Sequence, residues 1–260
     1  MQAWRENKMI HYAVVTTSGM VRPINEDNFY LNGAVKNTTR ANVGMRNKTA
    51  GPQALFAVCD GLGGEGCGEQ AAYIAASGLK EYQDSFMERY AGYIARTNQI
   101  ICREQKVMGV HMGCTIAALA VSDGKILALN IGDSRIYRLH EGELTILSKD
   151  HNEFETLVRF GLAAPEEYYS SPARNRLTRV LGMPEEEGVL TPHVAEEIGC
   201  EPGDLYLLCS DGFCGTVLPE EIRTLLQQKG SLLSKCKKMV KRAVEHGSDD
   251  NVTAMLIELE

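Results

Sequence analysis

Short apolar runs, bounded by glycine and polar residues, recur along the chain and predict β-strands. Most are rich in Val, Leu, Ile and Tyr, which is typical of buried strands. The expected strands are residues 10–16, 28–35, 54–59, 115–121, 125–130, 134–139, 144–148, 189–197, 204–210 and 251–259. Those between 115 and 148 follow one another closely, which favours antiparallel pairing. Residues 36–52 are polar and rich in turn formers, so we expect a loop there.

An apolar stripe at helical spacing predicts a helix at 232–246, with Ser231 as the N-cap and Gly247 just beyond the C-cap. The lysines and arginines of this helix lie largely off the stripe and form a solvated face. The stripe consists of Leu232, Leu233, Cys236, Met239, Val240, Ala243 and Val244. Further helices are expected at 69–83, 85–107 and 219–228, with a shorter one from 149 to about 160.

Strands and helices come in groups along the chain and do not alternate strictly. This grouping favours an antiparallel α+β fold over a doubly wound parallel sheet. No linker, repeat or low-complexity stretch divides the sequence. We therefore expect a single domain over residues 1–260.

The composition is that of a globular protein, with 44% hydrophobic and 23% charged residues in 260. The net charge of −7 argues against nucleic acid and against an anionic membrane surface, because both require a basic face. No apolar run reaches the roughly 20 residues of a spanning helix, and the first residues lack a signal-peptide pattern. The eight cysteines include no C-x-x-C pair, which argues against zinc and thioredoxin-like sites. We expect a cytoplasmic protein in a reducing compartment.

Four aspartates stand at or next to the ends of predicted strands: Asp60, Asp133, Asp211 and Asp250. A single Asp-Gly is also a common turn, but four such acids are harder to explain in that way. Carboxylates held together on a rigid frame repel one another unless cations neutralise them. Such clusters suit hard divalent ions such as Mg²⁺ or Mn²⁺.

Arg22, Glu26 and Asp27 follow the first predicted strand and add a cation and two acids to this set. An arginine beside a carboxylate-rich metal cluster can bind phosphate through two parallel hydrogen bonds, while the metal ions activate water.

Two other motifs are misleading. Residues 61–66 match G-x-G-x-x-G after a strand and before a helix, which is the spacing of a dinucleotide-binding loop. However, Asp60 and Glu65 would place negative charge beside a pyrophosphate, and no βαβ unit follows. Cys236 and Arg242 have the C-x₅-R spacing of cysteine-dependent phosphatases, but the residues between them are helical and include no glycine.

A series of short motifs in a fixed order resembles the metal-dependent type 2C serine/threonine phosphatases, in their bacterial form. The first is Val21-Arg22-Pro23-Ile24-Asn25-Glu26-Asp27-Asn28. The further segments are 56–64, 113–115, 130–137, 150–151, 205–212 and 247–253. The resemblance extends from about residue 10 to residue 259. It implies two stacked antiparallel sheets flanked by helices on both outer faces, with metal ions at one end and a mobile flap at residues 151–175.

The resemblance also implies the metal ligands. Asp60 would bridge two metal ions, Mn²⁺ or Mg²⁺, and the Gly61 carbonyl would bind one of them. Asp211 and Asp250 would complete the protein ligands of the other ion.

Glu26 and Asp27 match positions that bind metal directly or through water, and Arg22 matches the arginine that grips the substrate phosphate. Together with Asp60 these residues would carry the hydrolysis of phosphoserine and phosphothreonine in proteins by a metal-activated water. The expected partners are phosphorylated proteins and a serine/threonine kinase of opposite activity, and we expect a monomer. Two alternatives are a catalytically silent scaffold on the same fold and a nucleotide-binding oxidoreductase that would use the glycine-rich stretch.

The sequence departs from the family pattern at two positions. Leu62 stands where animal relatives often have histidine, so no leaving-group acid is assigned, and His151 is interpreted as structural. Gly215 stands where the family often has an acid that helps to bind a third ion, although Asp133, the other expected ligand, is present. We therefore expect two ions to bind tightly and a third weakly. Gly215→Asp should strengthen the third site, provided that the backbone there does not require a positive φ.

Overall fold

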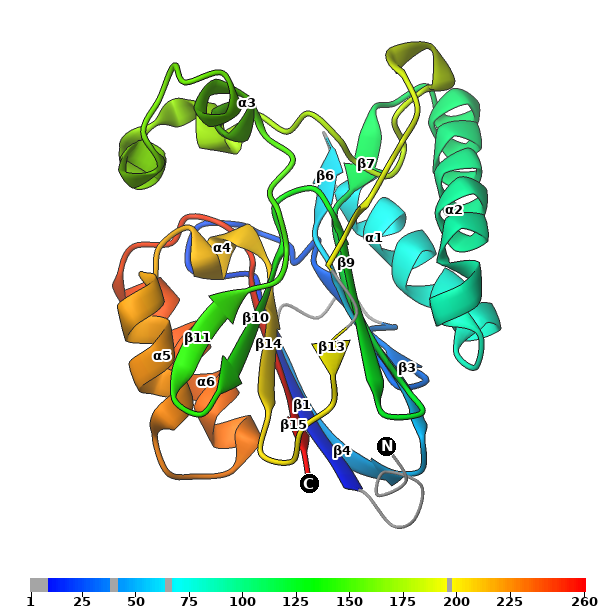
Figure 1. Cartoon of the computed structure of the whole chain (residues 1–260). Helices are drawn as coiled ribbons and strands as arrows, with labels where there is room; N and C mark the ends of the chain where they lie inside the picture. Colours follow the sequence, from blue (N-terminus) through cyan, green and yellow to red (C-terminus); the bar gives the residue numbers. More distant parts are fainter. Residues whose placement is uncertain (1–8, 38–41, 64–66, 196–197) are drawn as a thin grey trace.

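The structure, a computed structural model, describes residues 9–37, 42–63, 67–195 and 198–260. Two antiparallel sheets stack face to face, and helices cover the outer face of each (Figure 1). Every strand pair within these ranges is antiparallel. The expected α+β sandwich is confirmed in its layers.

The first sheet has six strands in the order β11-β10-β14-β15-β1-β4. These strands are Glu143–Ile146 (β11), Arg135–His140 (β10), Leu205–Cys209 (β14), Val252–Leu259 (β15), Met9–Thr17 (β1) and Asn42–Ala50 (β4). Its outer face packs against α5 (Pro219–Gln227) and α6 (Leu232–Glu245).

The second sheet has seven strands in the order β12-β9-β8-β5-β2-β3, with β13 also paired to β9. These strands are His193–Val194 (β12), Lys125–Ile131 (β9), Ile116–Ser122 (β8), Gln53–Cys59 (β5), Asn28–Leu31 (β2), Ala34–Val35 (β3) and Ile198–Gly199 (β13). Its outer face packs against α1 (Cys67–Gly78) and α2 (Phe86–Met108), which are joined by a 3₁₀ turn at Leu79–Tyr82.

Short elements complete the chain. The strands β6 (Gly61–Gly63) and β7 (Met112–Cys114) pair with each other. A four-residue helix, α4 (Asp211–Cys214), follows β14 after Ser210. The remaining helical segments are α3 (Glu153–Arg159) and the 3₁₀ turns Pro165–Ser170, Pro172–Asn175 and Glu185–Glu187.

Side-chain alternation along β1 explains how one strand serves two cores. Ile10, Tyr12 and Val14 point into the core between the two sheets, whereas Ala13 points to the core beneath α6. Both faces are therefore apolar, as in the other central strands, and the run reads as continuously hydrophobic. Burial of one such large side chain stabilises the fold by about 1.5–3 kcal/mol.

The prediction of a loop at residues 36–52 is wrong for most of this segment. Residues 42–50 form β4, which pairs with all nine residues of β1, from Met9 opposite Ala50 to Thr17 opposite Asn42. The strand lies at the sheet edge and exposes most of its polar side chains, so it lacks the apolar pattern that marks a buried strand. Residues 38–41 lie outside the described ranges. Similarly, the long strand expected at 189–197 is reduced to His193–Val194, and residues 196 and 197 are not described.

The helix termini follow their expected caps. The Ser231 hydroxyl accepts a hydrogen bond from the Ser234 N–H, and Gly247, with φ of 83°, lies just after the C-cap of α6. Asn152 caps α3 by accepting from the Glu155 N–H at 3.0 Å. Among the described helices, none combines the length and the apolar character needed to cross a membrane.

Candidate metal centre

Strand ends from both sheets bring acidic side chains together at one end of the sandwich. Asp27 directly precedes β2 and Asp60 directly follows β5, and the register pairs Asn28 with Cys59, so these two acids lie at the same edge. In the other sheet β14 ends before Asp211 and its antiparallel neighbour β15 begins after Asp250. We refer to Asp27, Asp60, Asp133, Asp211 and Asp250 as the acid cluster.

Burial and mutual repulsion raise the pKa values of four of these carboxyls, those of Asp27, Asp60, Asp133 and Asp211. Burial raises the pKa of Asp60 well above its usual range, and the charges of the other four members raise it further. Burial likewise raises the pKa of Asp133, with Asp211 as the strongest neighbouring charge. Burial and Asp250 raise the pKa of Asp211, while a side-chain hydrogen bond with Asp60 lowers it. Such a cluster holds protons unless cations replace them.

Asp27 shows most directly that a cation fits the cluster. Its carboxylate is fully buried, and Oδ2 accepts hydrogen bonds from Ser210 Oγ at 2.8 Å and Thr253 Oγ1 at 2.6 Å. The other oxygen, Oδ1, has no hydrogen-bond partner among the described residues. Burial raises the pKa of Asp27 to about 7. A buried oxygen without a donor is costly, and a metal ion or its bound water would satisfy it.

Glu26 lies beside the cluster and is fixed at two points. Its backbone N–H donates to Asn251 Oδ1 at 2.7 Å, and its Oε1 accepts from the Gly68 N–H at 3.1 Å. Burial raises the pKa of this carboxyl. Gly61 packs closely against the backbone of Gly68, because a Cβ at position 61 would lie 2.1 Å from the Gly68 carbonyl oxygen. Only glycine fits at position 61 without a backbone shift.

Arg22 contacts the cluster at its exposed side. Its Nη2 donates to Asp250 Oδ2 at 2.8 Å, and its Nε donates to the Asp249 carbonyl at 3.2 Å. Within the described residues, no three His, Cys, Asp or Glu side chains are arranged as a closed set of metal ligands. The donors are all oxygens, which is the chemistry that Mg²⁺ and Mn²⁺ prefer.

The structure adds polar residues that the sequence did not single out. Asn251 links three segments, because its Nδ2 also donates to the carbonyls of Ile24 at 2.8 Å and Ser18 at 3.3 Å. Lys36 is buried, and its Nζ donates to the Asn25 carbonyl at 2.5 Å. Burial lowers the pKa of Lys36, while nearby acids, Asp27 foremost, raise it. Lys36 stood in the segment predicted as a loop, so no pattern marked it.

The expected flap segment, residues 151–175, is linked through Arg174 to the residue that follows α4. Its Nη1 donates to the Gly215 carbonyl at 2.9 Å, one turn beyond Asp211. Gly215 has φ of −77°, so its backbone does not exclude a side chain. However, a Cβ at Gly215 would lie 2.7 Å from the Asp211 carbonyl oxygen. An acid at this position would therefore push against a candidate metal ligand.

The glycine-rich stretch does not form a nucleotide-binding unit in the described chain. Its first residues form β6, which pairs antiparallel with β7, and residues 64–66 lie outside the described ranges. A βαβ unit would require a parallel partner. Cys236 and Arg242 both lie within helix α6, so their spacing does not form a phosphate-binding loop.

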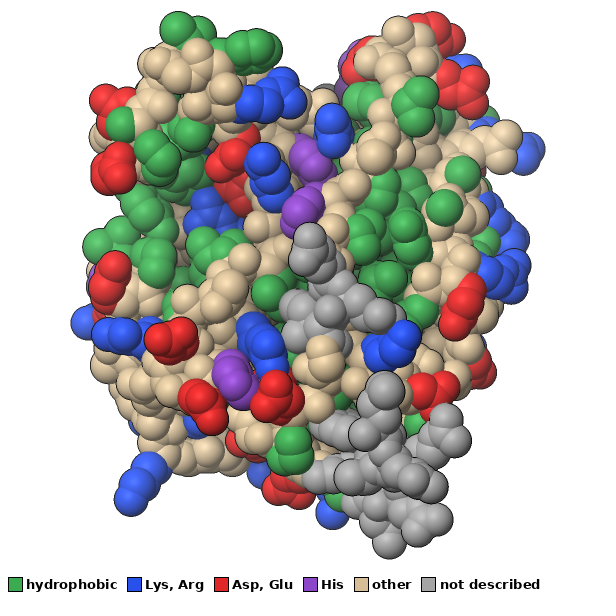
Figure 2. All heavy atoms as spheres, in the orientation of Figure 1, with side chains coloured by type: hydrophobic (Ala, Val, Ile, Leu, Met, Phe, Trp, Pro, Cys, Tyr) green, Lys and Arg blue, Asp and Glu red, His purple; other side chains and the backbone are tan. Residues whose placement is uncertain are grey.

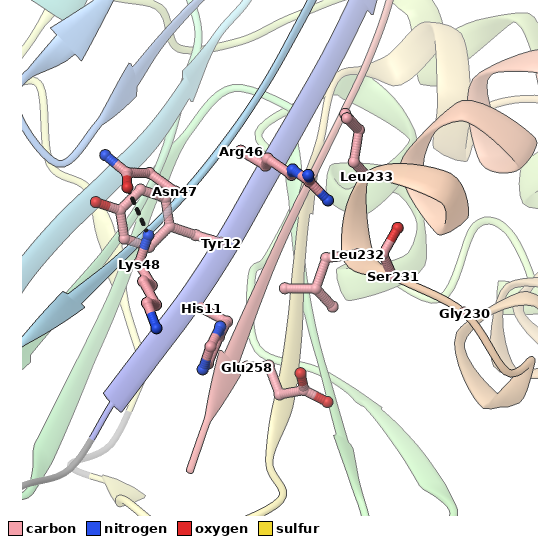
Figure 3. Close-up of a pocket in the computed structure, with 10 residues that line it drawn as sticks. All are labelled: His11, Tyr12, Arg46, Asn47, Lys48, Gly230, Ser231, Leu232, Leu233 and Glu258. Carbon is pink, nitrogen blue, oxygen red and sulfur yellow. Dashed lines mark hydrogen bonds between the residues drawn. The ribbon is translucent and has the colours of Figure 1, made fainter.

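A cavity of about 460 Å³ lies on the outer face of the first sheet, far from the acids (Figure 3). His11 of β1, Lys48 of β4 and Glu258 of β15 line it, and Figure 3 draws them together with Leu232 and Leu233 from the start of α6. Glu258 lies eight positions after Asp250, mostly along β15, which separates them by about 26 Å at roughly 3.3 Å per residue. This cavity is therefore separate from the candidate metal centre.

Comparisons with known proteins agree with this geometry. The family described as protein phosphatase 2C matches residues 44–257. The chain is 30% identical over 262 residues to the serine/threonine protein phosphatase PstP of Mycobacterium tuberculosis, covering 98% of this chain and 46% of PstP. It is 29% identical over 263 residues to the serine/threonine phosphatase stp of Listeria welshimeri, covering 96% of each. The chain thus spans about half the length of the first relative and nearly all of the second.

Solved structures show the same fold. The crystal structure of M. tuberculosis PstP matches with a TM-score of 0.82 at 29% identity, over 97% of this chain and 99% of that one. The catalytic domain of PstP in complex with two manganese ions matches with a TM-score of 0.79 at 27% identity, over 97% and 99%. The two-sheet architecture and the family expected from the ordered motifs are confirmed. The chain belongs to the protein phosphatase 2C family.

Proposed function

We propose that this chain hydrolyses phosphoserine and phosphothreonine in proteins, with two Mn²⁺ or Mg²⁺ ions held by the acid cluster. The observation that carries the proposal is the convergence of buried acids around the unpartnered Asp27 Oδ1, with Arg22 at the exposed edge. A relative, PstP, was solved with two manganese ions. When bound, such ions act as Lewis acids and lower the pKa of a bound water.

The residues of the chain would divide the work by position. Asp60 would be shared by the two ions, and the Gly61 carbonyl would bind one of them. Asp211 and Asp250 would complete the protein ligands of the other ion. Glu26 and Asp27 would bind directly or through water, and their hydrogen bonds to Gly68, Ser210 and Thr253 already orient them. Asp133 lies close enough to Asp211 for the charge of Asp211 to raise its pKa, and it would serve a weaker third ion.

Arg22 would bind the substrate phosphate after it leaves Asp250. Its side chain is 48% exposed, so a phosphate can reach it from solvent. Two parallel N–H donors suit the geometry of a phosphate group. The flap segment, linked to the Gly215 carbonyl through Arg174, would form one wall of the substrate site.

The proposal also implies the substrates, the partners and the cellular location of the chain. The substrates would be phosphorylated proteins, a serine/threonine kinase would act in the opposite direction, and the chain would act as a monomer. All eight cysteines are free, which supports a reducing compartment such as the cytoplasm.

Phosphate release tests the proposal directly. Wild-type chain and Asp211→Asn would be assayed on p-nitrophenyl phosphate and on phosphopeptides with Mn²⁺, with Mg²⁺ and with EDTA. We expect turnover only with metal and only in the wild type. Absence of phosphate release from a folded, metal-loaded wild type would favour the silent scaffold instead.

A further inference from the structure

A polar cavity of about 380 Å³ is lined in part by the first residues of the flap segment and lies outside the acid cluster. It is lined by residues around Asp150, by helix α3 and by the chain that leads into β12, and no member of the acid cluster lines it. On the face shown in Figure 2, Lys, Arg and His side chains gather between the part of the molecule that carries α3 and the part that carries α2. The cavity is not used by the proposed hydrolysis.

Three cations line this cavity without an acidic partner. Lys149, Arg159 and Arg179 make no ion pair with any acid in the described chain. By contrast Arg176, on the same stretch, pairs with Glu153. Arg179 donates Nη1 to the Thr191 carbonyl at 3.1 Å, which holds its guanidinium in place and leaves its other N–H groups available.

A buried imidazole directs a donor into the same cavity. His151 is only 9% exposed, and its Nδ1 accepts from the Gly132 N–H at 3.1 Å. This bond places the ring proton on Nε2, which has no hydrogen-bond partner in the described part of the chain. Among the described residues Nε2 is not one of the buried polar atoms that lack a partner, so it is open to the cavity and can donate to a ligand with acceptor atoms.

The acids near the cavity do not cancel its positive charge. The Asp150 carboxylate is already bound by Arg135, at 3.0 and 2.7 Å, and by the Tyr168 hydroxyl at 2.8 Å. Glu155 remains as the one other acid among the lining residues. Burial lowers the pKa of His151 to about 4. The charges of Arg179, His193 and Lys149 lower it as well, while the charge of Asp150 raises it. These charges therefore act together within the cavity.

We propose that this cavity binds a phosphate-type oxyanion, and that in a substrate it receives a second phosphoryl group near the one that is hydrolysed. The Arg179 and Arg159 guanidiniums and the Lys149 ammonium supply charge, and the His151 Nε2–H supplies a directed donor. The evidence for an anion site comes from the cavity alone. The proposal that the anion is a phosphoryl group of a substrate rests on the proposed function. Inorganic phosphate is the other source of the same chemistry.

Phosphate binding to the full chain in EDTA tests the anion site without any catalysis. Inorganic phosphate would be titrated by calorimetry, with ¹H–¹⁵N spectra of the imidazole nitrogens as the local readout. We expect the His151 Nε2 signal to shift, and Arg159→Ala/Arg179→Ala to weaken binding about tenfold or more through loss of charge-assisted hydrogen bonds. Arg176→Ala is the matched control and should bind as the wild type does.

Both arginines extend from surface segments, so the double variant should fold, and circular dichroism with thermal unfolding verifies it. Arg179→Gln alone provides a milder second variant with the same expected direction. Equal phosphate affinity in the wild type and in the folded double variant, or an unmoved His151 signal, would overturn the anion site.

Peptides with one or two phosphoryl groups identify the source of the anion. Two groups would be placed one to eight residues apart, and kcat/KM compared with the singly phosphorylated peptide. We expect the doubly phosphorylated peptide to be preferred about tenfold at one spacing, which is equivalent to one charge-assisted contact. The double variant should lose this preference. Its hydrolysis of p-nitrophenyl phosphate should be unchanged. No preference at any spacing would overturn the substrate part. A wild type that binds phosphate in EDTA but releases none from any substrate would overturn the proposed function and leave the anion site standing.

Discussion

Arg22 and Asp250 hold each other across the exposed edge of the acid cluster, with Nη2 of the arginine 2.8 Å from Oδ2 of the aspartate. Arg22, which is expected to bind the substrate phosphate, is therefore paired with Asp250, which is expected to bind a metal ion. Their side chains are 48% and 37% exposed, and an exposed pair of this kind contributes only about 0–1 kcal/mol. A metal ion bound at Asp250, as proposed, would thus displace the arginine at small cost and free it for phosphate.

Arg22→Ala should separate the two roles. Loss of a charge-assisted contact predicts a decrease in kcat/KM of roughly 1.5–3 kcal/mol, with KM rising more than kcat falls. Mn²⁺ affinity should stay within about fivefold or increase, because the exposed pair that competes for Asp250 is gone. Steady-state kinetics with phosphate inhibition, and calorimetric Mn²⁺ titration, measure the two quantities. Unchanged phosphate inhibition would remove Arg22 from the substrate site.

Asp211→Asn and Asp250→Asn should abolish most turnover while the fold survives. Without metal, the variants should be at least as stable as the wild type, because each substitution removes one of several repelling negative charges. Mn²⁺ should raise the Tm of the wild type but not that of the variants. Thermal unfolding with Mn²⁺ and with EDTA measures this. Asp249→Asn, exposed in the same loop, is the control and should keep both the activity and the metal effect. Full turnover of both variants, or of the wild type in excess EDTA, would contradict the two-metal centre.

The sequence predicted the central strands and the longer helices because their apolar patterns come from packing on both faces. Strand β1, buried between the second sheet and α6, is the clearest example. Strand β4 was missed because an exposed edge strand owes its structure to the backbone pairing with β1, which leaves little trace in its own side chains. The order of layers came from the family resemblance, since the strand pattern alone permitted other topologies.

The acids could be identified from the sequence because each stands at a strand end, but their surroundings could not. Ser210 and Thr253 approach Asp27 from distant strands, and a hydroxyl beside a carboxylate has no local signature. Nor could spacing reveal that Arg22 would pair with Asp250, which lies 228 positions away. The steric limit at Gly215 likewise depends on how α4 ends.

Gly215→Asp was expected to strengthen a third metal site, and the close contact with Asp211 changes this expectation. The φ of −77° permits a side chain, but the added Cβ would lie 2.7 Å from the Asp211 carbonyl oxygen. We expect both Gly215→Ala and Gly215→Asp to lose roughly 1–3 kcal/mol of stability, which is typical of overpacking. Urea unfolding and Mn²⁺ titration measure the effects. A gain in metal affinity for Asp but not for Ala would show that the backbone adjusts and that the new carboxylate binds metal.

Asn251→Ala should reduce both stability and metal affinity, because one side chain joins the Glu26 N–H to the carbonyls of Ser18 and Ile24. Leaving buried groups unpaired suggests a loss of roughly 2–4 kcal/mol. Glu26 would also lose one of its two fixed points, which should weaken Mn²⁺ binding. Urea unfolding and calorimetry measure the two effects, and exposed Asn175→Ala is the control. Wild-type stability in Asn251→Ala would show that water replaces the amide.

His151 should make the stability of the fold fall as the solution becomes acidic. Burial lowers the pKa of His151 to about 4, from an ordinary value near 6.5, so the unfolded chain binds the proton first. The free energy of unfolding should therefore decrease as the pH falls from about 6.5 to 4, and this contribution should be complete below pH 4. His151→Gln removes the titration along with the Nδ1 bond to Gly132, so it should be less stable than the wild type at pH 7, and the difference should shrink toward pH 4. Urea unfolding at pH 7, 6, 5 and 4 measures the difference, with exposed His111→Gln as the control. A constant difference across this range would show that His151 is protonated equally readily in the folded and unfolded chains.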